Sequence, residues 1–167
     1  PDGDRAVYLS DLANNNVYEL YSVPITGSST PLRLTPMSSG KVLDFRLSPD
    51  GAWALYSDQG GRLFSVRTDG SAPPVDLHWG LSSEQSWESL AFTPDSSALL
   101  LLDIGEYSTY GGLVSGPLDG SAPVTRLDLV SHDHSAVRSF VVTPDSARVL
   151  FVADAVHDER YELFWIE

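Results

Sequence analysis

The chain has no cysteine and a single methionine among its 167 residues. Without cysteine it can form no disulfide, no thiolate metal site and no cysteine nucleophile. Long hydrophobic runs are missing too, because the longest, residues 98–102, has the length of one strand and is far too short to span a bilayer. No secretory leader is visible either. The chain opens on Pro1-Asp2-Gly3, inside a turn motif and without Met, so we expect a processed or excised segment.

Basic residues are scarce. Ten Lys and Arg stand against 23 Asp and Glu, which gives a formal net charge of −13. An acidic surface repels phosphate backbones and anionic headgroups, so we expect neither nucleic-acid binding nor membrane binding. Two explanations of the acidity stay open, namely simple solubility and carboxylate clusters that hold a cation or meet a basic partner. Hydrophobic residues make up 42%, which is enough for a packed core.

Catalytic motifs are absent as well. The sequence has no Gly-x-Ser-x-Gly elbow, no His-Glu-x-x-His pair and no phosphate-binding glycine loop. Residues 111–116 are glycine-rich, but no helix or lysine follows them, so we predict an irregular strand there. The chain is therefore predicted not to be an enzyme.

What the chain does have is a repeat with two signatures. The first begins at Pro1, Pro49, Pro94 and Pro144, each followed by Asp and then Gly or Ser. The second, Thr-Gly or Asp-Gly followed by Ser and a proline, covers residues 26–31, 69–73 and 119–123. Repetition of both signatures at a period in the forties indicates a repeat protein.

Each signature is a turn with a mechanical reason. Proline presets φ, aspartate bonds its own backbone two residues on, and glycine takes positive φ without steric cost. Between the turns lie short apolar segments, which in the second repeat are residues 52–57, 62–67, 75–78 and 87–92. Four short antiparallel strands per repeat are typical of a β-propeller blade. We predict an all-β chain of about three and a half blades, one β-propeller segment over 1–167 with repeats at about 1–41, 42–86, 87–135 and 136–167.

These residues resemble the TolB-type, or WD40-like, β-propeller repeat. The matching motifs are Ser48-Pro49-Asp50-Gly51, Tyr56-Ser57-Asp58, residues 19–23 (Glu-Leu-Tyr-Ser-Val) and residues 32–35 (Leu-Arg-Leu-Thr). The sequence departs from the pattern at Ser96 and Ser146, where the family prefers glycine, and at residues 113–117. The resemblance implies a module that binds protein partners in the periplasm or outside the cell. It also leaves open the gate domain of a prolyl-oligopeptidase-type hydrolase whose catalytic domain lies outside this chain.

Three and a half blades fall short of the four to eight that close a ring. Unclosed blades expose unpaired strand edges. We therefore expect self-association through the strands near Tyr8 and Tyr161.

The topology of a blade assigns each loop to one of two rims. The Pro-Asp and Asp-Gly turns share one rim, and the opposite rim receives His132, Asp133 and His134 together with His157 and Asp158. Imidazole and carboxylate suit zinc and other divalent ions, so these five residues are a candidate metal site. The alternative is two polar loops that contain histidine.

Acidic residues recur on that same rim near the ends of second strands. A ring of them could bind Ca²⁺, which takes six to eight oxygen ligands. The alternative is turn capping by the aspartate side chain. The residues are Asp11, Asp58, Asp103, Glu106, Asp154 and Asp158.

The aromatic residues fall into two groups. One group lies within strands and is expected to pack between blades: Tyr8, Tyr56, Phe64, Phe92, Phe140 and Phe151. The other lies in or near longer links and is a candidate partner-binding patch: Trp79, Trp87, Tyr107 and Tyr110. Exposed Trp and Tyr are favoured at protein interfaces. The sequence thus predicts a non-catalytic module that binds a protein or peptide, with the hydrolase gate and a divalent-cation-binding propeller as alternatives and no cofactor other than such a cation.

Overall fold

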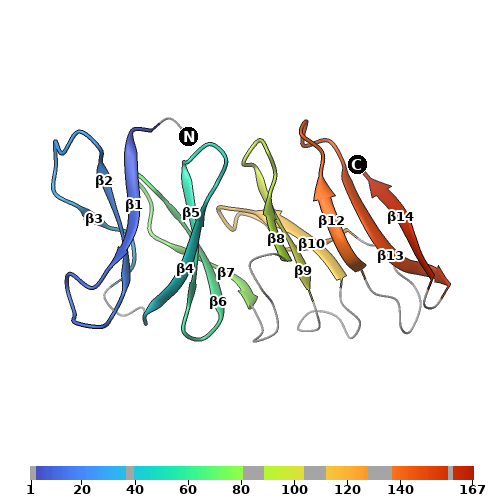
Figure 1. The fold of residues 1–167 in the computed structure, drawn as a ribbon, viewed down its shortest axis with the longest axis horizontal. Coiled ribbons are helices and arrows are strands. Elements are labelled where there is room, and N and C mark those ends of the chain that lie inside the picture. Colours follow the sequence, from blue (N-terminus) through green and yellow to red (C-terminus); the bar gives the residue numbers. More distant parts are fainter. Residues whose placement is uncertain (1–2, 37–39, 81–88, 104–111, 128–136, 158–159) are drawn as a thin grey trace. The chain divides into compact units, whose positions relative to one another are not determined.

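The computed structural model describes residues 3–36, 40–80, 89–103, 112–127, 137–157 and 160–167. Within these ranges the chain forms fourteen β-strands in four antiparallel sheets and no α-helix (Figure 1). Nothing in the same ranges is helical enough, or apolar over a sufficient length, to cross a bilayer as a helix. The chain divides into two compact units, residues 1–81 and 82–167, each with two sheets and a core of its own.

The first unit holds a three-stranded and a four-stranded sheet, with the strands of each in chain order. The first sheet consists of β1 (Arg5–Ser10), β2 (Glu19–Pro24) and β3 (Leu32–Arg33). The second consists of β4 (Val42–Leu47), β5 (Trp53–Asp58), β6 (Arg62–Arg67) and β7 (Val75–Gly80).

The second unit has the same construction with the sheet sizes reversed. The third sheet consists of β8 (Leu90–Phe92), β9 (Ala98–Asp103), β10 (Gly112–Pro117) and β11 (Thr125–Arg126). The fourth consists of β12 (Val137–Val142), β13 (Val149–His157) and β14 (Arg160–Ile166).

One local prediction was wrong. The glycine-rich segment forms a regular strand, β10, which pairs with β9 without interruption from Gly112 opposite Asp103 to Pro117 opposite Ala98. Backbone pairing with a long apolar partner strand overrides the weak strand propensity of glycine there.

The Pro-Asp turns are held by the residue that precedes the proline. Ser48 Oγ accepts a hydrogen bond from the Trp53 amide at 3.0 Å and also bonds Asp50 Oδ1 at 2.5 Å. Thr143 repeats this arrangement with the Arg148 amide at 3.0 Å and Asp145 Oδ1 at 2.5 Å. A hydroxyl at this position therefore closes the turn in both units, and the aspartate orients the hydroxyl.

The third position of these turns requires positive φ. Gly51 has φ 71°, but Ser96 and Ser146 stand at φ 61° and 58°. A left-handed conformation costs a non-glycine residue about 1 kcal/mol or more. Ser146 offsets part of this cost because its Oγ accepts a hydrogen bond from the Asp95 amide at 3.0 Å, which joins the Pro-Asp turns of the third and fourth sheets.

The Asp-Gly turns show why one glycine is required. Gly70 has φ 70°, and a Cβ added to it would lie 2.2 Å from Leu32 Cδ2. The positive φ favours glycine here, and any side chain at this position would also require the Leu32 side chain of β3 to move.

Every sheet has two different faces, because side chains alternate along each strand. One face carries a leucine from β2, β6, β10 or β14, and we call it the leucine face. The four leucines are Leu20, Leu63, Leu113 and Leu163. In the first, second and fourth sheets the other face carries an aromatic cross-strand pair, and we call it the aromatic face. Its pairs are Tyr8 with Tyr21, Tyr56 with Phe64 and Phe151 with Phe164, whose ring centroids lie 5.9, 5.2 and 5.6 Å apart.

The two cores are built in the same way from these faces. In the first unit Leu20 of the first sheet packs in one cluster with Val42, Tyr56 and Val66 of the second sheet. In the second unit Leu113 of the third sheet packs in the same way, in one cluster with Val137 and Phe151 of the fourth sheet. Within each unit the leucine face of the first-named sheet thus packs on the aromatic face of the second. The prediction that aromatic residues pack between blades is confirmed for Tyr56, Phe64, Phe140 and Phe151.

Candidate protein-binding face

Most residues of the candidate histidine metal site and of the candidate aromatic patch fall outside what the structure describes. His132, Asp133, His134 and Asp158 lie outside the described residues, and so do Trp87, Tyr107 and Tyr110. Trp79 lies in β7 and His157 at the end of β13, opposite Arg160, but their side chains are outside the description too. The candidate metal site and the candidate aromatic patch therefore stay predictions.

Two aspartates of the expected calcium ring are described in detail, and both cap turns. Asp58 is buried; its Oδ1 accepts the amides of Gly60 and Arg62 at 2.9 and 3.0 Å, and its Oδ2 accepts Arg62 Nε at 2.9 Å and Nη2 at 2.6 Å. These hydrogen bonds raise the pKa of Arg62 above its usual value. Asp11 Oδ2 accepts the Asn16 amide at 3.2 Å. The contacts favour the capping alternative at these two positions, and within the described ranges no three His, Asp or Glu side chains group as metal ligands.

Glu19 is a buried carboxylate that the sequence did not single out. It accepts Tyr21 Oη at 2.9 Å and Arg33 Nη1 at 3.2 Å, and only 1% of it is exposed. Burial, followed by the hydrogen bond to Glu19, raises the pKa of the Tyr21 phenol. This network joins β2 to β3, which share few backbone pairs, and is a structural feature of the first sheet.

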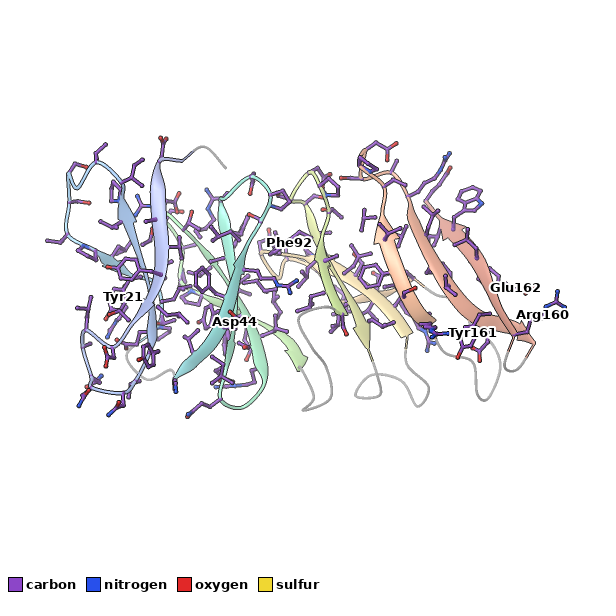
Figure 2. The ribbon with its side chains drawn as sticks, viewed as in Figure 1. Tyr21, Asp44, Phe92, Arg160, Tyr161 and Glu162 are labelled. Carbon is purple, nitrogen blue, oxygen red and sulfur yellow. The ribbon has the colours of Figure 1, made fainter. Side chains whose placement is uncertain are left out.

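The leucine face of the fourth sheet groups several exposed apolar side chains. Leu163 is 68% exposed and Trp165 61%, whereas Leu20 and Leu113 at the positions equivalent to Leu163 are both 0% exposed. Leu150 lies between Val141 and Trp165 in register, so these three side chains share the face. Tyr161 joins them by alternation along β14, and Figure 2 shows it at the start of that strand.

Two arginines border this face. The Arg138 guanidinium lies 5.3 Å from the centroid of the Tyr161 ring, and that of Arg148 lies 5.0 Å from the centroid of Trp165. Arg148 also pairs with Glu167 at 3.3 Å. Each arginine rests on a ring and keeps its charge at the margin, so the centre of the face stays apolar.

The sequence signal for this face was present in part. Tyr161, Leu163 and Trp165 alternate with Glu162, Phe164 and Ile166, a pattern typical of a strand with two apolar faces. Such a strand is buried on both sides in a sandwich of sheets. Only the structure shows that Phe164 and Ile166 pack in the core while the other three are exposed.

No protein-family model matches the chain, and no curated protein matches it. Solved structures do match. The tricorn protease aligns with a TM-score of 0.62 at 12% identity, over 98% of this chain and 16% of its own. An oligogalacturonate lyase from Vibrio parahaemolyticus aligns with a TM-score of 0.56 at 13% identity, over 95% of this chain and 45% of its own. The fold is that of a β-propeller.

A third propeller match is a putative dipeptidyl aminopeptidase IV from Bacteroides ovatus, with a TM-score of 0.54 at 12% identity, over 97% of this chain and 28% of its own. At these identities the likeness shows the fold alone. The chain spans less than half the length of each of these three propeller proteins. The expectation of all-β propeller blades is thereby confirmed, with four sheets of three or four strands that form part of a propeller. The TolB-type assignment stays a prediction.

Proposed function

We propose that the chain is a non-catalytic, TolB-like propeller module that binds protein, and that its binding surface is the exposed leucine face of the fourth sheet. The partner is a second copy of this chain, which contacts this surface with the aromatic face of one of its blades. The TolB resemblance adds a setting in the periplasm or outside the cell.

The observation that carries the proposal is the positional equivalence of three leucine faces. Those of the first and third sheets are each covered by the aromatic face of the following sheet. The leucine face of the fourth sheet has Leu163 at the same position but exposes it, and it carries Trp165 where the other two have Ser22 and Ser115. The shared leucine position favours a partner of the same kind as the covering face.

The chain itself carries the complementary surface. Tyr8 and Tyr21 stack on the aromatic face of the first sheet, opposite Val7 and Leu20, which face the core. Neither tyrosine belongs to the core cluster of residues 1–81, and because Tyr21 is only 5% exposed, the half-buried Tyr8 is the ring that this face offers to a partner. A head-to-tail contact between copies would therefore repeat the packing seen inside each unit.

Light scattering on a size-exclusion column tests this. The wild type is expected to form dimers or larger species as its concentration rises, because burying Leu163 and Trp165 contributes roughly 1.5 to 3 kcal/mol each. Leu163→Glu should shift the protein to the monomer, since it places a charge in the centre of the apolar contact.

Leu12→Glu is the matched control. Leu12 is 66% exposed, nearly the same as Leu163, but lies in the loop between β1 and β2. It should leave the mass in solution unchanged. A wild type that stays monomeric at high concentration, or a Leu12→Glu variant that dissociates equally, would contradict the proposed face.

The hydrolase gate is a second candidate. It is favoured because two of the matched structures are a protease and a putative aminopeptidase whose chains are several times longer than this one. This candidate requires that the gene continue into a domain with a nucleophile elbow, and sequencing the flanking DNA decides it. The divalent-cation candidate gains no support from Asp11 and Asp58, which cap turns.

A further inference from the structure

A pocket of ≈ 200 Å³ opens in the first unit, between β1 of the first sheet and the two turns that bracket β5 and β6 of the second sheet. Two arginines and two aspartates supply its charges, Arg5 and Arg67 with Asp50 and Asp69. Val7 and Leu47 supply apolar surface. The volume equals that of about seven water molecules, so it suits one small group rather than a drug-sized ligand.

Three of the four charged groups are held by neighbours. Arg67 Nη2 pairs with Asp69 Oδ2 at 3.3 Å, and its guanidinium lies 5.3 Å from the Trp53 ring centroid. Asp69 Oδ1 accepts the amide and the hydroxyl of Ser71 at 2.9 and 2.7 Å. Asp50 Oδ1 accepts the Ser48 hydroxyl and the Ala52 amide.

Arg5 differs from these three. Its Nε donates to Ser22 Oγ at 2.8 Å, and Ser22 is fully buried. This single bond restrains the guanidinium at its Nε. Its terminal nitrogens, Nη1 and Nη2, make no hydrogen bond or ion pair with any residue that the structure describes. An oriented guanidinium with two parallel donors at its end is the geometry that binds a carboxylate through both oxygens.

The surroundings disfavour a doubly charged anion more than a singly charged one. Asp50 and Asp69 lie in the same pocket, and the whole chain carries −13. A doubly charged phosphate would be repelled more strongly than a carboxylate by both. Val7 and Leu47 offer contact to a short alkyl group beside the carboxylate.

We propose that this pocket binds a carboxylate with a short side chain, supplied by a peptide C-terminus or by an acidic side chain, and that Arg5 is its anchor. The proposal goes beyond the protein-binding face, because the pocket lies in the other unit and shares no residue with it.

The test follows the backbone amide signals of Gly51, Thr68 and Asp69 by NMR. Four probes are titrated: N-acetylalanine, its amide, the α-amide of N-acetylaspartate and inorganic phosphate. We expect saturable shifts with the two carboxylates in the millimolar range, and little change with the amide or with phosphate. The carboxylate that binds more tightly identifies the source, terminus or side chain.

Three variants locate the anchor. Arg5→Gln should abolish the shifts, and Arg5→Lys, which keeps the charge but loses the fork, should weaken binding about tenfold. Arg160→Gln is the control, because Arg160 is an exposed arginine of the other unit, 3.9 Å from Glu162. It should bind like the wild type.

Dispersed amide signals establish that each variant is folded. If Arg5→Gln does not fold, Arg5→Lys alone tests the role of Arg5. Equal shifts with N-acetylalanine and its amide would overturn the proposal. So would phosphate binding tighter than either carboxylate, unchanged binding by Arg5→Lys, or the absence of any saturable shift in the folded wild type.

Discussion

Two buried tyrosines, Tyr21 and Tyr56, differ in what their hydroxyl groups contact. Both are buried and both stack on an aromatic neighbour. Tyr21 donates its hydroxyl to Glu19 at 2.9 Å. The Tyr56 hydroxyl is buried without a hydrogen-bond partner among the described residues, and burial raises the pKa of its phenol well above the usual range.

This difference predicts opposite effects of removing the hydroxyl. Tyr21→Phe should lower the free energy of unfolding by about 1 to 2 kcal/mol, because it leaves the buried Glu19 with one donor fewer. Tyr56→Phe should change it by less than about 0.5 kcal/mol, or raise it, because it removes an unsatisfied polar group. Urea unfolding at pH 7 measures both. Equal losses would mean that Tyr56 has a partner that the contacts above do not include.

At the scale of the element, the turns carry most of the lowered carboxyl pKa values. The Ser71 amide and hydroxyl lower the pKa of Asp69 to about 2. The Thr93 hydroxyl, followed by Ser97, lowers that of Asp95 to about 2. Hydrogen bonds from Ser121 and Thr143 likewise lower the pKa values of Asp119 and Asp145, respectively. Because the pKa is depressed in the folded state, these groups stabilise the fold above pH 4 and lose that contribution as the pH falls toward 2.

Asp69→Asn tests this linkage. The urea concentration at the unfolding midpoint of the wild type should decrease as the pH is lowered from 5 to 2. The variant should be less stable than the wild type at pH 7, and the two midpoints should converge near pH 2, where Asp69 itself becomes protonated. Parallel pH curves for the two proteins would show that Asp69 does not contribute through its charge.

The elements also show how far the sequence reaches. The turns and most strands were predictable, because proline, aspartate and glycine have fixed backbone preferences and recur with the period of the repeat. The exposure of the leucine face of the fourth sheet was not, since alternation along β14 shows two apolar faces without showing which one is covered. Arg5 was not predictable either, because its pocket forms between strands of two different sheets. Contacts between residues far apart in the sequence leave no local pattern.

At the scale of the whole molecule, charge and apolar surface act against each other. Two copies that approach through the exposed leucine face each bring a net charge of −13. The repulsion is long-ranged at low salt and is screened over a Debye length of about 10 Å at 0.1 M. The apolar contact depends little on salt at these concentrations.

Self-association should therefore strengthen as NaCl rises from about 0.02 to 0.5 M, which is opposite to the behaviour of an interface held by ion pairs. Sedimentation equilibrium across this range gives the dissociation constant at each salt concentration. Leu163→Glu should remain monomeric throughout, because screening restores no apolar contact. If the dissociation constant instead rises with salt, ion pairs hold the copies together, and the contact lies elsewhere than on Leu163 and Trp165.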